Sequence, residues 1–123
     1  MTAKDYLSEI QRLKVIIDQK EKERSYIKAV NKSLFPKEEG KFQKLLLEID
    51  GEIAKSLQKW QEIIGQIYSM PDAKSIRILY MRYVELKTYE AIAEELSYSE
   101  CYVMELHKKA LKAFEKIFLS PVY

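Results

Sequence analysis

Cys101 and His107 are the two side chains whose types most directly suggest metal or nucleophilic chemistry, and the chain has one residue of each type. If both lie on one helix, six residues separate them by about 240° around its axis, so they cannot bind one metal ion together. His107 is instead predicted to lie at the edge of a hydrophobic core. With no Gly-rich phosphate loop and no nucleophile motif in the sequence, we expect no enzyme activity, catalytic residue, metal or cofactor.

The surface around Cys101 suggests a different chemistry. A helical wheel over 99–118 separates an apolar arc from a polar one. The apolar arc is predicted to contain Val103, Leu106, Ala110, Phe114 and Ile117. The outward face contains Cys101, Met104, Glu105, Lys108, Lys112 and Lys116, with Glu100 on its shoulder. Its lysines suit phosphates, and its glutamates can accept hydrogen bonds from cytosine in the major groove of DNA. The same face can also serve as a protein-docking surface.

Shorter elements must position this helix. Thr88 is a good N-cap for a helix over 89–96, and Ser97-Tyr98-Ser99 predicts a tight turn into the long helix. Ala93 is small enough for the two helices to cross closely, and Tyr98 is expected to fill the turn. The inward residues of the first helix are predicted to be Ile92, Ala93 and Leu96. A preceding helix, starting at Pro71 or Asp72, is expected to turn one side inward, with Ile76, Leu79, Tyr80 and Tyr83.

The string RILYMRYVELKTYEAIAEELSYSECYVMELHKKALKAF resembles region 4 of bacterial sigma factors. With the charged N-terminal segment, LHKKAL resembles small phage-encoded transcriptional regulators of the ArpU and RinA type. The resemblance assigns Thr88 and Ser99 to capping positions, and Arg82 and Tyr83 to the family's L-R-Y motif. Ser97 stands where the family has glycine. The family's Thr and Arg in the second helix are replaced by Tyr102 and Leu106.

This resemblance implies that the second helix binds duplex DNA in the major groove. The DNA-binding residues are then expected among Ser99, Glu100, Cys101, Met104, Glu105, Lys108, Lys109 and Lys112. The implied function is a sequence-specific transcriptional regulator of phage or prophage genes, acting as an activator in the cytoplasm of a bacterial host cell. Two alternatives remain open: a module that docks on RNA polymerase or a sigma factor without reading DNA, and a phage DNA-packaging adaptor.

Residues 1–70 are predicted to form an antiparallel, coiled-coil-like helical hairpin, because two heptad-like apolar stripes match each other. Thr2 is expected to cap the first helix, and the turn is expected within 36–40. In the matching register Ile17 faces Trp60. The same register places Lys20 opposite Ser56 and Arg24 opposite Glu52. The pattern is equally compatible with pairing inside one chain and between two chains.

Composition supports an all-α protein. The spacing of the residues and the resemblance above add the expected organisation, a helical hairpin over 1–70 and a helix-turn-helix domain over 71–123. Hydrophobic residues make up 47% and charged residues 33%, and three Gly and three Pro leave few turns for a sandwich or barrel. No signal peptide or membrane span is expected. The net charge of +2 falls entirely in the first 70 residues. Since a neutral DNA-binding domain offers few phosphate contacts, we expect a homodimer that spans two half-sites.

Overall fold

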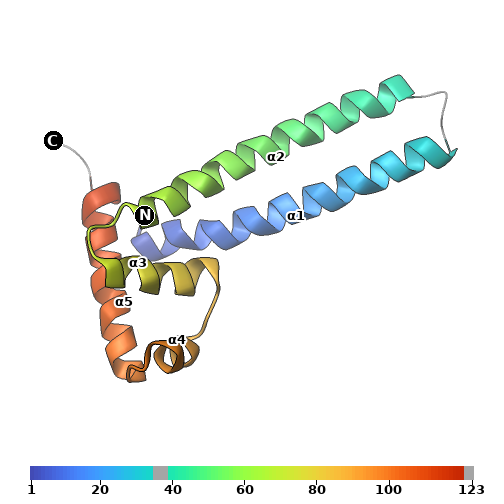
Figure 1. Cartoon of the computed structure of the whole chain (residues 1–123). Helices are drawn as coiled ribbons and strands as arrows, with labels where there is room; N and C mark the ends of the chain where they lie inside the picture. Colours follow the sequence, from blue (N-terminus) through green and yellow to red (C-terminus); the bar gives the residue numbers. More distant parts are fainter. Residues whose placement is uncertain (35–38, 121–123) are drawn as a thin grey trace. The chain divides into compact units, whose positions relative to one another are not determined.

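The computed structural model describes residues 1–34 and 39–120, with side chains described for 1–30 and 40–120. The elements, in chain order, are α1 (Ala3–Leu34), α2 (Glu39–Tyr68), α3 (Ala73–Leu79), η2 (Tyr80–Val84), α4 (Tyr89–Leu96), α5 (Glu100–Phe114) and η3 (Glu115–Leu119) (Figure 1). η2 and η3 are short π-helical turns that continue α3 and α5. Over the described ranges there is no strand, which confirms the all-α prediction. None of the helices seen there is long and apolar enough to cross a membrane.

The first two helices form the predicted antiparallel hairpin, within one chain. The Thr2 hydroxyl accepts a hydrogen bond from the Asp5 backbone N–H at 3.2 Å, which confirms the expected cap. The apolar stripes are buried along both helices, at Leu7, Ile10, Leu13, Ile17, Ile27, Ile49, Ile63 and Ile67. Most of the expected turn, 36–38, lies outside the described residues.

The register of the hairpin differs from the expected one by up to one helical turn. Lys20 pairs with Glu52 at 2.8 Å, although Ser56 was expected opposite it. The Arg24 guanidinium pairs with Asp50 at 2.5 Å, two residues before the expected Glu52. The reason lies in the helix ends: α1 ends at Leu34 and α2 already begins at Glu39, so the connection is centred earlier than 36–40.

The chain packs into two compact units. One is 12–60, which contains most of α1 and α2, and the other joins 1–11 to 61–123. In the second unit the Tyr6 ring packs against Phe114, with ring centroids 5.8 Å apart, and the Tyr6 hydroxyl donates to Gln66 Oε1 at 2.6 Å. The first turns of α1 thus help to bury Phe114. The division into domains over 1–70 and 71–123 stays a prediction.

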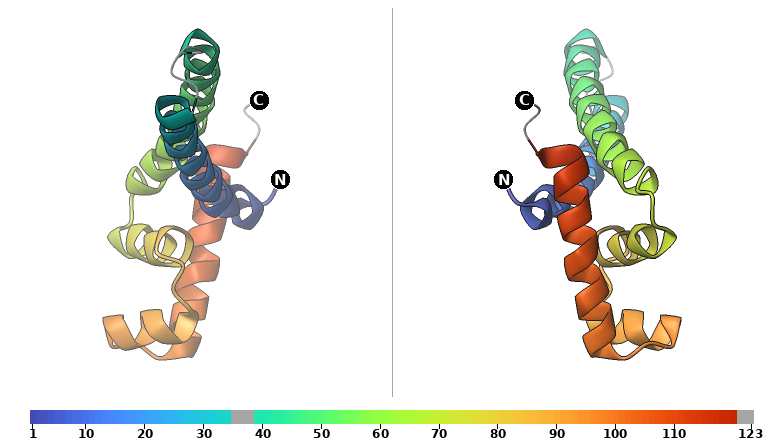
Figure 2. Two further views of the ribbon diagram at one scale, coloured as in Figure 1. Left: turned by 90° about the vertical axis from the view of Figure 1, so that its right-hand side faces the viewer. Right: turned by 90° about the vertical axis from the view of Figure 1, so that its left-hand side faces the viewer.

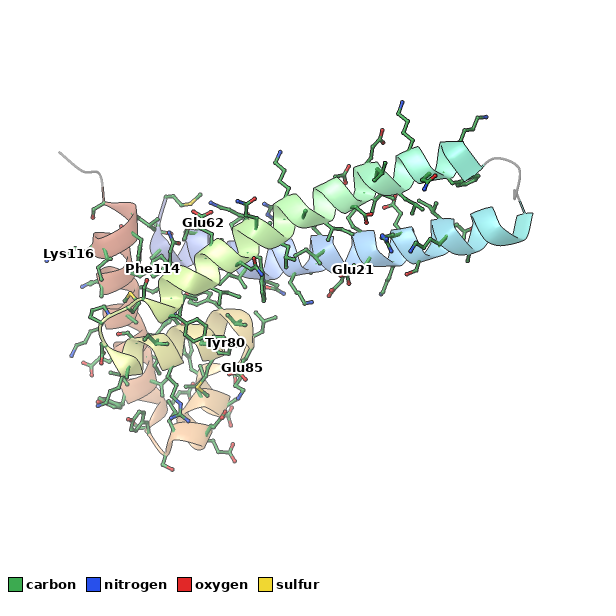
Figure 3. All side chains as sticks on the ribbon, turned by 45° about the horizontal axis from the view of Figure 1, so that its top comes forward. Glu21, Glu62, Tyr80, Glu85, Phe114 and Lys116 are labelled. Atoms are coloured by element: carbon green, nitrogen blue, oxygen red, sulfur yellow. The ribbon has the colours of Figure 1, made fainter. Side chains whose placement is uncertain are left out.

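The helix before the helix-turn-helix turns a different side inward from the one predicted. Leu79 and Tyr83 are buried as expected, but Ile76 and Tyr80 are only half-buried, and Ile78 and Met81 enter the core instead. The π-helical turn η2, which contains Tyr80 and ends just before Glu85 (Figure 3), begins after Ile78, so it does not cause the difference. The inward side is set by packing against α5, where Ile78 and Met81 join the core that contains Val103.

A second π-helical turn corrects the prediction for the end of the long helix. Ile117 was expected on the apolar arc but is 49% exposed. Phe118 is half-buried instead, and its ring packs against Phe114 with centroids 4.8 Å apart. The extra residue in η3 moves Phe118 toward the side that Ile117 would occupy in a regular α-helix.

Candidate nucleic-acid interface

The predicted helix-turn-helix is present and closes around its own hydrophobic core. α3 and α4 pack against the same side of α5, as Figure 2 shows. The buried centre consists of Ile78, Met81, Ile92, Ala93 and Val103, with Tyr89, Leu96, Tyr98 and Leu106 packed against it. Ala93 and Tyr98 therefore have the packing positions that the sequence predicted. This core fixes α5 on one side and leaves its other side in solvent.

The tight turn between α4 and α5 is built from local hydrogen bonds. Ser99 caps α5, its hydroxyl accepting from the Tyr102 backbone N–H at 3.2 Å. Thr88 caps α4 in the same way, accepting from Ala91 N–H at 3.1 Å. Ser97 adopts a left-handed conformation with φ 59° and ψ 40°. Ser97 therefore adopts the left-handed conformation at the position where the resembled family has glycine. For a residue with a side chain this conformation costs about 1 kcal/mol.

The loop that enters α4 has a second left-handed residue, Leu86, with φ 58°, which the sequence did not suggest. This conformation lets the Lys87 backbone N–H donate to the Met81 carbonyl at 3.0 Å. Arg82 then holds the loop: its Nη1 donates to the Lys87 carbonyl at 2.8 Å, and its guanidinium lies over the Tyr89 ring, 4.4 Å from the centroid. The arginine of the L-R-Y motif thus has a structural role here.

The structure brings the eight candidate residues together on α5 and at its N-cap, and all eight are exposed. They are Ser99, Glu100, Cys101, Met104, Glu105, Lys108, Lys109 and Lys112. Met104 is 48% exposed, which leaves a large apolar side chain on the surface. Their contact with DNA stays a prediction.

His107 lies at the edge of the core, as predicted, and is buried. Its Nε2 is 2.8 Å from the Tyr83 hydroxyl and its Nδ1 is 3.1 Å from the Tyr89 hydroxyl. Burial, together with the charges of Arg82 and Lys4, lowers the pKa of His107 to about 4. The neutral ring therefore donates to one tyrosine oxygen and accepts from the other tyrosine hydroxyl.

A cation from α3 lies beside the first turn of α5, which the sequence alone could not reveal. Lys74 Nζ donates to the Tyr102 hydroxyl at 3.5 Å, and this hydrogen bond raises the pKa of Lys74. Tyr102 is held in turn by an edge-to-face contact with Tyr98, with centroids 4.9 Å apart. The two partners in the hydrogen bond are 28 positions apart, so no local pattern links them.

The geometry defines a helix-turn-helix module with one exposed, mixed-charge helix face. Residues 72–114 match the family model described as Sigma-70, region 4, a helix-turn-helix family that binds DNA and regulates transcription. The matched range runs from the N-cap of α3 to the last residue of α5. Searches of curated proteins and of solved structures gave no match. This part of the chain is therefore similar to a family of DNA-binding regulatory proteins.

Proposed function

We propose that the protein is a sequence-specific, duplex-DNA-binding transcriptional regulator of phage or prophage genes, of the ArpU and RinA type. We further propose that it acts as an activator and as a homodimer in the cytoplasm of a bacterial host. The observation that carries the proposal is the orientation of α5. The segment matching sigma-70 region 4 closes its core with one face of α5 and exposes all eight candidate residues on the remaining surface.

The charges along α5 suit a helix that enters the major groove with its first turns. Met104 and Glu105 are then nearest the base edges, and a glutamate there can accept from cytosine N4. Lys108, Lys109 and Lys112 follow toward the end of the helix, where they can neutralise phosphates as the groove curves away. The earlier turns of α5 would thus contact base edges, and its later turns would contact the DNA backbone.

Selection of bound fragments from a pool of random duplexes, at stated salt, tests the proposal directly. Fluorescence anisotropy with a selected duplex and a scrambled duplex then measures both affinities at several salt concentrations. We expect Lys108→Ala to weaken binding to both duplexes similarly and to reduce the salt slope by about one ion. Lys14→Ala, which removes an exposed charge from α1, is the matched control and should change little. Wild-type protein that binds no duplex near 50 mM salt would contradict DNA binding.

A groove on the same module favours docking on RNA polymerase or a sigma factor as the second candidate function. It has a volume of about 370 Å³ and a mainly apolar wall that includes Tyr68, Ile76, Tyr80 and Met81. The Tyr68 and Tyr80 rings are in contact there, with centroids 5.7 Å apart, and Tyr68 is 58% exposed. If the protein acts by docking, Tyr80→Ala should abolish capture of polymerase or sigma factor, and Lys108→Ala should leave any DNA affinity unchanged.

A further inference from the structure

The first helix of this helix-turn-helix is poorly suited to the DNA backbone. In helix-turn-helix proteins the first helix crosses the phosphates next to the groove that the second helix enters. Here α4 contains Glu90, Glu94 and Glu95 and no Lys or Arg. Glu90 and Glu94 are exposed, and Glu95 forms an ion pair with Lys87. Phosphates beside α4 would therefore meet acidic side chains, and a cation has to come from another element.

Lys74 on α3 is placed to supply that cation. Its Nζ donates a hydrogen bond to the Tyr102 hydroxyl and lies 6.0 Å from the centre of the Tyr102 ring. Both residues are exposed, so the ammonium group is held in place and remains open to solvent. On the α5 wheel Tyr102 lies about 20° from Lys109 and about 60° from Glu105. Lys74 thus places a positive charge beside the first turn of α5, on the side of the helix where Lys109 lies further along.

We infer that Lys74, positioned by the hydroxyl of Tyr102, binds a backbone phosphate of the duplex beside the first turn of α5. The inference rests on the proposed DNA binding. It also gives a role to Tyr102, which stands where the resembled family has Thr: the phenol carries its hydroxyl far enough from α5 to reach Lys74. The ligand is a phosphodiester, recognised by charge, so this contact adds affinity for all sequences equally.

Salt-dependent anisotropy with the selected and scrambled duplexes tests Lys74. We expect Lys74→Ala to reduce the salt slope by about one ion and to weaken binding to both duplexes by about threefold to fivefold. Lys74→Arg should keep the wild-type slope, and Lys14→Ala again controls for net charge. Circular dichroism at the assay temperature checks that each variant is folded.

Tyr102→Phe tests the positioning, because it removes the hydroxyl and keeps the ring. Alone it should weaken binding about twofold to threefold and leave the salt slope unchanged, since the cation is still present. In the Lys74→Ala background it should have no further effect, which is the signature of one residue acting through another. An equal loss in both backgrounds would overturn the positioning role of Tyr102.

The outcomes separate this inference from the function on which it rests. If the wild type binds no duplex, the proposed function fails and the inference fails with it. If the wild type binds and Lys74→Ala behaves like Lys14→Ala in slope and affinity, DNA binding stands and the phosphate contact of Lys74 is overturned.

Discussion

His107 Nε2 lies 2.8 Å from the Tyr83 hydroxyl, in a buried contact between α5 and the turn that follows α3. Because both ring nitrogens contact tyrosine hydroxyls, the imidazole ties α5 to two segments of the chain. This arrangement suits the neutral ring, since a charged ring would need two acceptors and would bring a third positive charge near Arg82 and Lys4.

The free energy of unfolding should therefore decrease as the pH is lowered from about 6.5 to about 4. The pKa of His107 is lowered from 6.5 to about 4, so the unfolded chain takes up a proton that the folded protein resists. The contribution of neutral His107 is complete above pH 6.5 and is lost progressively toward pH 4, by about 3 kcal/mol in all. Urea unfolding at pH 7, 6 and 5 measures the loss. His107→Gln should have a flatter profile between pH 6.5 and 5, and an unchanged profile would contradict this assignment.

Replacing the left-handed residues with glycine should stabilise the protein. Ser97 and Leu86 have φ near 60°, where glycine avoids the steric cost of a side chain. Ser97→Gly and Leu86→Gly should each raise the free energy of unfolding by about 1 kcal/mol, measured by urea titration. Ser25→Gly, at an exposed position inside α1, is the control and should lower it by about 0.5 kcal/mol.

The Trp60 indole contributes through its ring and not through its N–H. Nε1 is buried and has no hydrogen-bond partner among the described residues, while the side chain as a whole is half-buried. Trp60→Phe should therefore change the free energy of unfolding by less than about 1 kcal/mol, because it removes an unsatisfied donor. Trp60→Ala should cost about 2–4 kcal/mol through lost packing. A loss well above about 1 kcal/mol in Trp60→Phe would show that the N–H is satisfied.

If α5 reads bases, Glu105 should restrict which base pair is accepted. Glu105→Gln removes a charge that repels phosphates, so affinity for scrambled duplexes should rise, while preference at one base position relaxes by about 1–3 kcal/mol. Competition anisotropy against single-position variants of the selected duplex measures both effects. Glu94→Gln on α4 is the control: it should raise affinity for all duplexes and leave the base preference intact. Loss of preference in the control would place base readout elsewhere.

The proposed homodimer should form through the hairpin. Leu47 is 68% exposed and lies on the same face of α2 as the exposed residues Gly51 and Ala54, which would let a second helix approach closely. Light scattering at micromolar concentration should give about twice the chain mass of 14.6 kDa, and Leu47→Lys should halve it. Val15→Lys, at a 52% exposed position of α1, should leave the dimer intact. A monomeric wild type, alone and on DNA, would remove the proposal.

Features set by neighbouring residues could be predicted from the sequence, and features set by tertiary packing could not. Thr2, Thr88 and Ser99 cap helices because a side chain and the following backbone N–H groups decide a cap locally. The helical wheel correctly predicted the exposed face of α5, because the chain is a regular α-helix from Glu100 to Phe114.

The π-helical turn η3 broke that regularity after Phe114. One inserted residue moved Ile117 into solvent, and no composition signal marks where such a turn occurs. The predicted hairpin register was also wrong. The apolar stripes determine which faces of the two helices meet, but they determine less well the position of one helix along the other. The contact between Lys74 and Tyr102 depends on how α3 packs against α5, so it needed the assembled fold.

The contact of Tyr6 with Gln66 and Phe114 has a consequence for the order of events during synthesis. The Tyr6–Gln66 bond closes a loop of 60 positions, and Phe114 lies further on still. A ribosome therefore delivers the first turns of α1 long before the helix against which they pack. The hairpin segment 12–60 can pair early, whereas the helix-turn-helix module can be completed only when α5 has emerged and the first turns of α1 pack against it. A nascent chain stalled before α5 would therefore contain a paired hairpin segment and an incomplete helix-turn-helix.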